Sequence, residues 1–343
     1  MERLDIAVRT LCAEFREAAL ARSSMERDMR AEGTFARKRV KGATYWYAQH
    51  YEDGVARQVY FGTSNKENDA KVEAARKRAL DRKKTLAALL RKEQRLAAML
   101  RRGGLPSLDR REAQVLVALS DSGLAHRHGV LVGTHAFGAY SGLLGALFAG
   151  GSLATNDIDI VSEPVVSVAL DKPVDILAVL RKSGLDFHEV PALSAKYPSS
   201  SFLSAAGLRV DLLTPLAGRP RGNVALPRIL GAGATPLPFL DFLIRDSIDA
   251  VLIGPDRGIA VTVPSPARFA VHKLAIAARR PASEAAKTLK DIEQASELIA
   301  ALAEEQPAEL ATALRSAARI GGKFKSYLDK GKRMLPAEAA ALL

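Results

Sequence analysis

The chain has a single cysteine and no long apolar run. Only Cys12 carries a thiol among 343 residues, so an intramolecular disulfide and a cysteine-based zinc site are both excluded. The mainly apolar stretch at residues 143–149 is rich in Gly and Ala and far shorter than a membrane span. The first residues include Glu2 and Asp5 and lack the apolar core of a secretion signal. We therefore expect a soluble, cytoplasmic protein without a membrane partner.

Acidic residues are few in the first third of the chain relative to basic ones. The formal net charge is +12, and residues 1–110 hold 25 Lys and Arg against 15 Asp and Glu. The remaining residues are nearly balanced, with 25 against 23. A concentrated basic segment indicates a polyanionic partner, because cations bind by neutralising phosphates. A solvated, solubilising surface is the alternative reading.

A helix, a small sheet and a second helix are predicted within this basic segment. Apolar residues at helical spacing predict the first helix over 3–30. Alternating β-branched and aromatic residues then indicate strands, and Asp53-Gly54 between two of them is typical of a tight hairpin turn. The predicted strands span 34–40, 44–51 and 55–61.

The second helix has both a start signal and a stop signal. Ser64 and Glu67 form a predicted capping box, and the helix is expected to run to about Arg102. The Gly- and Pro-containing segment 103–106 ends it and marks the clearest boundary in the first half of the chain.

From Ser107 onward, helical and strand patterns alternate until the composition becomes Ala-rich and helical after Pro266. The stretch 215–238 is irregular, and 239–264 is expected to form several short strands. Helices are predicted at 109–122, 134–148, 173–183, 266–279, 284–303, 307–318 and 322–329, and strands at 129–133, 156–161, 186–190, 201–205 and 208–214. We therefore predict three domains, at 1–104, 105–264 and 265–343.

Two acids alternate with isoleucine in the segment Asp157-Ile158-Asp159-Ile160. In a strand, alternate side chains share a face, so the two carboxylates project together while the isoleucines enter the apolar layer. Carboxylates held together repel each other unless a cation lies between them. A third acid, Asp211, interrupts another short apolar strand. Three acids on neighbouring strands indicate a site for divalent metal.

A Gly133-Thr134 pair lies where an apolar strand meets a helix of small residues. The backbone N–H groups at a helix N-terminus bind phosphate, and a glycine lets the phosphate approach because it has no Cβ. Beside the three acids, this turn points to nucleotide phosphates bound with Mg²⁺ (or Mn²⁺).

The segments VLVGTHAFGAY, TNDIDIV and RVDLL resemble the DNA polymerase β-type nucleotidyltransferase superfamily. Its signature is an apolar residue, Gly-Gly or Gly-Ser, a spacer, Asp-x-Asp and a distant third acid, and the likeness covers roughly 109–255. Thr134 stands at the second turn position, and the spacer from it to Asp157 is long. The segments VPSPARFAVHKLAIAARR and KTLKDIEQASELI are similar to helices that follow the catalytic core in bacterial members, including AbiEii-type toxins. The likeness is greatest to a bacterial branch with the same basic hairpin extension.

The resemblance implies an α/β (α+β) fold. A mixed-sheet nucleotidyltransferase core would lie between a basic N-terminal helix–hairpin–helix module and a C-terminal helical domain. It also implies transfer of a nucleoside monophosphate from an NTP to a hydroxyl, assisted by two Mg²⁺ ions. The implied catalytic and metal-binding residues are Asp157, Asp159 and Asp211.

Nucleotide binding is implied for the phosphate turn and for the later helices. Gly133 and Thr134 match the turn, and the resemblance puts Lys273 on a helix that faces the site. Arg279 and Lys290 are further candidates for holding the triphosphate. Ordinary surface charge is the alternative for these three cations and, for Lys290, an ion pair with a neighbouring acid.

The predicted hairpin interleaves aromatic and basic residues. Tyr45 and Tyr47 share one strand face and Trp46 lies on the other, so stacking on nucleic acid and packing on neighbouring helices both explain the pattern. The candidate nucleic-acid-binding residues are Arg37, Lys38, Arg39, Lys41, Tyr45, Tyr47, Arg57, Lys77, Arg78, Lys83 and Lys84.

The sequence as a whole therefore predicts a metal-dependent nucleotidyltransferase acting on nucleic acid, with a structured RNA such as tRNA as the first choice of acceptor. Two alternatives remain open. The same chemistry could act on a protein or small molecule, as in a toxin or defence protein, with an oligomeric state or an antitoxin partner to match. The chain could instead be a non-catalytic nucleic-acid-binding protein on a degenerate transferase core.

Overall fold

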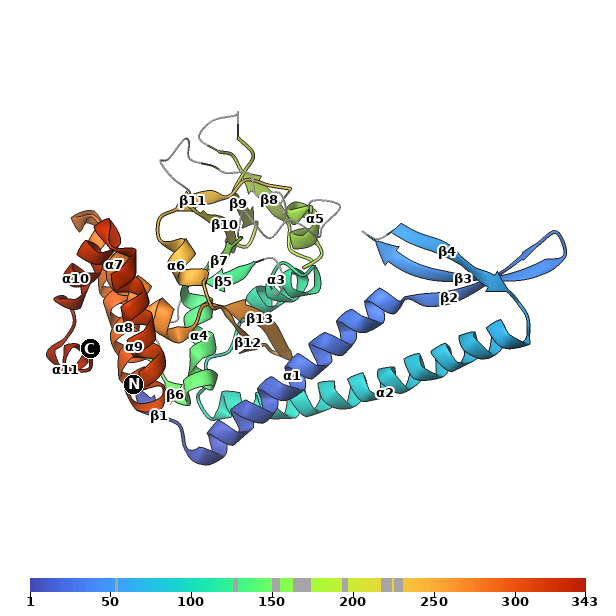
Figure 1. Cartoon of the computed structure of the whole chain (residues 1–343), viewed down its shortest axis with the longest axis horizontal. Coiled ribbons are helices and arrows are strands. Elements are labelled where there is room, and N and C mark those ends of the chain that lie inside the picture. Colours follow the sequence, from blue (N-terminus) through green and yellow to red (C-terminus); the bar gives the residue numbers. More distant parts are fainter. Residues whose placement is uncertain are drawn as a thin grey trace.

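Two long helices form a stalk that carries a small sheet at one end and joins the core of the protein at the other, where a larger mixed sheet and a group of C-terminal helices lie (Figure 1). This is a computed structural model, and its mixed α/β architecture confirms the predicted fold class. The predicted division into three domains stays a prediction. The structure describes residues 1–52, 55–125, 129–149, 155–162, 174–192, 197–216, 224 and 231–343.

The stalk helices are α1 (Ile6–Glu32) and α2 (Lys66–Arg102), which lie close to their predicted ranges. The predicted capping box of Ser64 and Glu67 is wrong. The Ser64 N–H donates to the Thr44 carbonyl at 2.8 Å, so Ser64 still belongs to the small sheet. The cap therefore moves one residue on, to Asn65, whose side chain accepts from the Asn68 N–H.

The small sheet contains three antiparallel strands in the order β2-β3-β4. Each of these strands coincides closely with a predicted one. The prediction of strands from alternating β-branched and aromatic residues is therefore confirmed. The predicted turn at Asp53-Gly54 lies outside the described residues. The strands are β2 (Thr34–Val40), β3 (Ala43–Glu52) and β4 (Val55–Thr63).

A buried ion pair joins both stalk helices to the core. Arg22 of α1 donates from Nε to Glu93 Oε1 of α2 at 2.7 Å and from Nη2 to the Gly258 carbonyl at 2.7 Å. The Gly258 N–H returns a hydrogen bond to Glu93 Oε2 at 2.9 Å. Because Glu93 is fully buried and Arg22 is 4% exposed, every charged oxygen and nitrogen involved depends on this network for its partners.

The core sheet is mixed, with strand order β5-β7-β10-β9-β8 and β11 beside β10. Strands β7 and β10 are parallel, whereas β5 pairs with β7 and β9 pairs with β10 in antiparallel fashion. The strands are β5 (Val130–Val132), β7 (Asp157–Val161), β8 (Phe187–Val190), β9 (Ser201–Ser204), β10 (Arg209–Pro215) and β11 (Thr235–Leu237). A separate hairpin is formed by β12 (Ile248–Ile253) and β13 (Gly258–Val263).

Three helices accompany the core sheet. Helix α3 (Arg110–Asp121) starts at a capping box of Asp109 and Glu112. Helix α4 (Gly133–Leu144) ends earlier than predicted, because Gly145 adopts a left-handed conformation with φ +62. The two-residue strand β6 (Ala146–Leu147) follows and pairs with β1 (Glu2–Arg3). Helix α5 (Ile176–Arg181) is shorter than the predicted 173–183, part of which lies outside the described residues.

The segment 239–264 differs from its prediction in one place. Residues Leu240–Ile244 form a short helix, α6, where a strand was expected. Four of its five residues are buried, so the apolar residues do not alternate with polar ones. The sequence therefore offers no pattern that distinguishes a helix from a strand here. The strands expected in the rest of the segment are confirmed as β12 and β13.

The C-terminal region is helical, as predicted. Within the described part of the chain, no helix combines the length and apolar character needed to cross a membrane. The helices are α7 (Pro266–Arg279), α8 (Ala285–Glu305), α9 (Pro307–Ile320), α10 (Gly322–Lys332) and the short α11 (Ala337–Ala340).

The buried ion pair leads to a stability prediction. Replacing Glu93 by Gln removes the fully buried one of the two carboxylates that pair with the Arg22 guanidinium and leaves Glu26 alone, and we expect the free energy of unfolding to fall by about 3 kcal/mol. The matched control is Glu14→Gln, which removes the exposed Glu14–Lys92 pair on the same two helices and should cost less than about 1 kcal/mol. Urea unfolding followed by circular dichroism measures both. Equal effects of the two substitutions would contradict the anchoring role.

Candidate active site

The parallel pairing of β7 and β10 brings the three predicted acids onto one face of the core sheet. Asp211 lies directly opposite Asp159 in the register, and Asp157 lies two residues earlier on the same face. The intervening Ile158 and Ile160 are fully buried on the other face, at 0% and 1% exposure. The apolar layer therefore holds the strands, and the strand alternation directs the carboxylates to the opposite side.

Asp159 is the most perturbed acid of the group. The pKa of its carboxyl is raised from 3.8 to about 6, by burial most of all and then by the negative charges of Asp211 and Asp157. The positive charges of Lys273 and His135 act in the opposite direction but do not compensate. A bound cation would therefore stabilise the ionised form of Asp159.

Asp211 already has a cationic neighbour. Arg209 donates from Nε to Asp211 Oδ1 at 2.8 Å, and the Ser201 hydroxyl donates to the same oxygen. Arg209 lies opposite Asp157 in the β7–β10 register, and the charges of all three acids raise the pKa of its guanidinium, its hydrogen bond to Asp211 most of all. The sequence analysis did not identify Arg209. Its position two residues before Asp211 in a predicted strand could have shown that both side chains lie on the same face of the sheet.

The predicted phosphate turn lies against the acids. Strand β5 pairs with β7 so that Val132 is opposite Asp159, and Gly133 follows with φ +68. A Cβ on Gly133 would lie 2.6 Å from Asp159 Oδ2. Strand pairing thus brings turn and acid together despite the long spacer between Thr134 and Asp157. No side chain caps the N-terminus of α4, whose first residues are Gly133 and Thr134.

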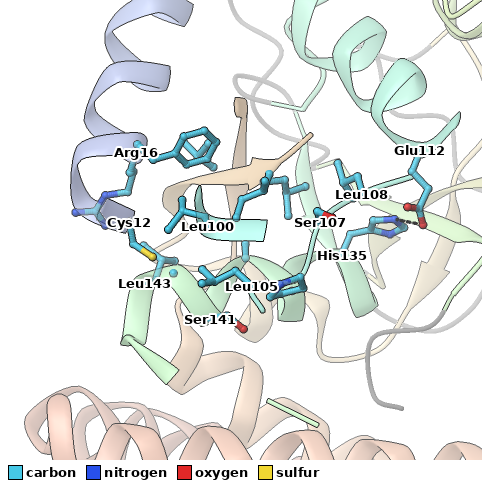
Figure 2. A pocket seen from close by; sticks show the side chains of 18 of the residues that line it. Cys12, Arg16, Leu100, Leu105, Ser107, Leu108, Glu112, His135, Ser141 and Leu143 are labelled. Atoms are coloured by element: carbon cyan, nitrogen blue, oxygen red, sulfur yellow. Dashed lines mark hydrogen bonds and ion pairs between the residues drawn. The ribbon is translucent and has the colours of Figure 1, made fainter. Parts of the chain in front are cut away.

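His135 is a further polar group beside the turn. Its Nε2 donates to Glu112 Oε1 at 3.2 Å, while the same Glu112 caps α3 through its other oxygen. Its buried Nδ1 has no hydrogen-bond partner. Figure 2 shows the His135–Glu112 pair on one side of a cavity of about 100 Å³, with Cys12 and Arg16 of α1 on the other side. Thr134 also lines this cavity. The three aspartates do not line this cavity, so it is separate from the carboxylate face.

Two lysines from the C-terminal helices lie within electrostatic reach of the acids. Lys273 of α7 donates to Asp291 Oδ1 of α8 at 2.6 Å and lowers the pKa of Asp159. Burial lowers the pKa of Lys290, followed by the charge of Lys273, and Asp157 acts in the opposite direction. Lys273 therefore forms an ion pair with Asp291 and also acts electrostatically on Asp159.

The structure does not bring Arg279 into this group. Arg279 is exposed at the last residue of α7. The next residue, Arg280, instead donates from Nε to Asp291 Oδ2 at 2.7 Å and thereby shares its acid with Lys273. The sequence could not show which of the two adjacent arginines, Arg279 or Arg280, turns inward, because the helix end that decides it has no sharp sequence signal.

Aromatic packing sets the position of α7 relative to the turn. The rings of Phe137 and Tyr140 of α4 lie 6.2 Å and 5.3 Å from the ring of Phe269 on α7. The Tyr140 hydroxyl also donates to the Pro264 carbonyl at 2.9 Å. Lys273 Nζ lies 5.2 Å from the Phe269 ring. The helix that starts at the phosphate turn therefore packs directly on the helix that supplies Lys273.

The fit of a divalent metal can be judged from the donor set. Among the described residues, no group of three or more His, Cys, Asp or Glu side chains is arranged to hold a metal ion. Mg²⁺, however, typically takes one or two carboxylates and completes its shell with water and substrate phosphates. Asp157 and Asp159 supply two hard oxygen donors on one face, and the raised pKa of Asp159 shows uncompensated negative charge there. The residues fit such an ion.

The candidate nucleic-acid-binding residues lie on the small sheet and the outer half of α2. Tyr45, Tyr47 and Lys38 share one face of the sheet, because Lys38 is opposite Tyr45 in the register. Arg37 lies on the other face, opposite Trp46. The remaining candidates are exposed: Arg39, Lys41, Arg57, Lys77, Arg78, Lys83 and Lys84.

The close approach of Gly133 to Asp159 can be tested by adding one methyl group. Gly133→Ala places a Cβ against the carboxylate and a non-glycine residue at positive φ, so we expect a loss of about 1–3 kcal/mol in the free energy of unfolding. Gly142→Ala in the same helix meets only Cys12 atoms at 3.9 Å and should be neutral or slightly stabilising. Urea unfolding compares the two variants, and a neutral Gly133→Ala would contradict the contact.

The raised pKa of Asp159 predicts a pH dependence of stability. The folded state binds the Asp159 proton more tightly than the unfolded state, so stability should fall as pH rises from about 4 to about 6 and the loss should then be complete. The loss is up to about 3 kcal/mol. Asp159→Asn, which cannot ionise, should lack this fall. The measurement is urea unfolding at each pH in the presence of a chelator, and parallel curves for the two proteins would contradict the shift.

Comparison with known proteins places this arrangement in a family. No curated protein and no solved structure matches the chain. A family model described as a nucleotidyltransferase matches residues 110–319, well over half of the chain. The matched range contains the strand–turn–helix at Gly133, all three acids and the helices that carry Lys273 and Lys290. The chain therefore belongs to this nucleotidyltransferase family.

Proposed function

We propose that this protein transfers a nucleoside monophosphate from an NTP to a hydroxyl group of an RNA acceptor and releases pyrophosphate. The observation that carries the proposal is the approach of Asp159, with Asp211 opposite it, to the uncapped start of α4 at Gly133. Carboxylates and unpaired backbone N–H groups at one place are suited to a metal-bound triphosphate.

The phosphate turn and the two lysines bind and orient the triphosphate in this proposal. The backbone N–H groups at Gly133 and Thr134 donate to phosphate oxygens, and the α4 dipole favours their negative charge. Lys273 lies within electrostatic reach of Asp159, and Lys290 within reach of Asp157. Both lysines stabilise the negative charge that develops on the departing pyrophosphate. Packing of Phe269 on α4 keeps Lys273 in place relative to the turn.

Asp157 and Asp159 would hold Mg²⁺ or Mn²⁺, with Asp211 as the third acid of the site. When bound, the divalent cation neutralises phosphate charge and lowers the pKa of the attacking hydroxyl. The acceptor hydroxyl gives its proton to solvent water, and its oxygen bonds to the α-phosphorus. The bond between that phosphorus and the bridging oxygen then breaks, and pyrophosphate leaves. The exposed Arg209 can release Asp211 when the substrate charges change, because its side chain is 43% exposed.

The basic stalk supports a nucleic-acid acceptor. Lys77, Arg78, Lys83 and Lys84 are exposed on α2, which at 37 residues is about 55 Å long. An acceptor that contacts this helix and also enters the site must itself be extended, as a structured RNA such as tRNA is. An RNA and NTP substrate pair fits a cytoplasmic location. Relationship to AbiEii-type toxins would instead favour a protein or small-molecule acceptor, with an antitoxin or a second copy as partner.

The test is to incubate the protein with each α-³²P-labelled NTP, Mg²⁺ and total bacterial RNA. We expect one nucleotide to label RNA, and Asp157→Asn or Asp159→Asn to reduce labelling by roughly a hundredfold or more. Glu189→Gln is the matched control, because Glu189 is an exposed acid of the same sheet on the face opposite the three aspartates. Chelation should abolish labelling, and added Mg²⁺ or Mn²⁺ should restore it.

The other outcomes separate the alternatives. Label in a protein band or a small molecule, with the same dependence on Asp157 and Asp159, would retain the chemistry and replace the acceptor. RNA binding without any label transfer would favour a non-catalytic protein on a degenerate core. Labelling that survives both aspartate substitutions would contradict the assigned site.

A further inference from the structure

The small sheet at the end of the stalk has two chemically different faces. In the register of β3 and β4, Tyr47 lies opposite Tyr60, whereas Ala48 lies opposite Val59. Tyr45, Tyr47 and Tyr60 therefore share one face, which we name the tyrosine face. Trp46 and Val59 belong to the other face.

The face with Trp46 is used to attach the sheet to the stalk. Trp46 is only 5% exposed, and its indole Nε1 donates to Asp69 Oδ1 of α2 at 2.6 Å. The Arg76 guanidinium of α2 lies 5.0 Å from the Trp46 ring, and that of Arg37 lies 5.8 Å from it. Of the two roles that the sequence left open for the aromatic residues, Trp46 therefore has the structural one.

The tyrosine face is arranged differently, as a cluster of rings at the surface. The Tyr60 ring lies 6.1 Å from that of Tyr45 and 5.9 Å from that of Tyr47, and Lys38 Nζ lies 5.1 Å from the Tyr47 ring. Tyr60 is 56% exposed. Tyr45 and Tyr47 are half-buried beside it, so the three rings form one partly exposed aromatic surface.

We propose that the tyrosine face binds an unpaired segment of RNA by stacking its bases on Tyr45, Tyr47 and Tyr60. The assignment of RNA as occupant rests on the function proposed above, whereas the stacking surface rests on the sheet itself. Aromatic rings on an open antiparallel sheet match the flat faces of nucleobases, which are accessible only where the strand is unpaired.

The charge around the rings supports a nucleic acid over an apolar protein segment. Lys38 lies on the tyrosine face itself, and Arg39 and Lys41 are exposed on the same strand and its turn. Residues 1–110 contain 25 basic and 15 acidic residues, so the surroundings attract phosphates. Gln49 and Gln58 are opposite each other on the same face, with their amides 3.1 Å apart, and amides donate to and accept from ribose 2′-hydroxyls.

The distance between the small sheet and the candidate active site would let this binding select acceptors by length. The sheet lies at the far end of the stalk, away from the C-terminal helices that border the candidate active site (Figure 1). The Arg22–Glu93 network holds the stalk to the core, so the distance from sheet to site is determined by the fold. A single-stranded region held at the sheet would let only acceptors of suitable length present a hydroxyl at the site.

The experiment measures binding of a fluorescein-labelled twelve-nucleotide oligouridine to the full chain without NTP or metal. Tyr60→Ala should weaken binding roughly tenfold, because one stacked base is lost, and Tyr60→Phe should retain it. Val59→Ala is the matched control, because Val59 is the preceding residue, is equally exposed at 56% and lies on the other face. Circular dichroism verifies that each variant is folded.

Two further ligands test the occupant. A duplex of the same length should bind more weakly than the single strand, and an oligothymidine should bind more weakly than the oligouridine. A stronger effect of Val59→Ala than of Tyr60→Ala would overturn the choice of face, tighter duplex binding would overturn stacking, and equal DNA binding would overturn RNA as the occupant.

Failure of this proposal is separable from failure of the proposed function. Oligouridine binding that depends on Tyr60 in a protein that transfers no label would leave the tyrosine face in place and reject the transferase. Label transfer that is unaffected by Tyr60→Ala, with no oligouridine binding, would do the reverse.

Discussion

The candidate active site depends on the parallel pairing of β7 with β10. That register puts Asp159 directly opposite Asp211 and draws Asp157 and Arg209 onto the same face. The apolar side of both strands is fully buried, so the carboxylates cannot separate without exposing the core beneath them. Hydrophobic packing thus maintains a concentration of negative charge that is unfavourable by itself, and burial together with these charges raises the pKa of Asp159.

The elements around this charge supply its complement. Strand β5 brings Gly133 against Asp159, and α4 begins there without a side-chain cap on its N-terminus. The aromatic contact between α4 and α7 then places Lys273 near the same carboxylates. A substrate that carries negative phosphates together with a divalent cation would balance these groups better than either ion alone. This balance is the physical reason to expect a metal–triphosphate complex here.

The stalk connects a second surface to this site. Its buried Arg22–Glu93 pair is satisfied only when α1, α2 and β13 are assembled, so it specifies how the two helices sit on the core. On the small sheet, the structure separates roles that share one sequence pattern. Trp46 attaches the sheet to α2, while the neighbouring tyrosines remain at the surface. An acceptor bound by both surfaces would be selected by its length as well as by its chemistry.

The sequence by itself determined most of the element types and all three acids. Alternation identified the strands with Asp157, Asp159 and Asp211, and glycine after an apolar strand identified the turn, because both signals are local. Local signals were insufficient at Ser64, because its backbone N–H bonds to Thr44 of the small sheet. They were also insufficient in α6, where nearly every residue is buried and no alternation is left. Only the tertiary structure decided that Arg209 pairs with Asp211, that Arg280 rather than Arg279 reaches Asp291, and that Trp46 and Tyr60 have different roles. These outcomes depend on which segments meet across the fold, and strand register and helix packing are set by burial of the whole core rather than by neighbouring residues.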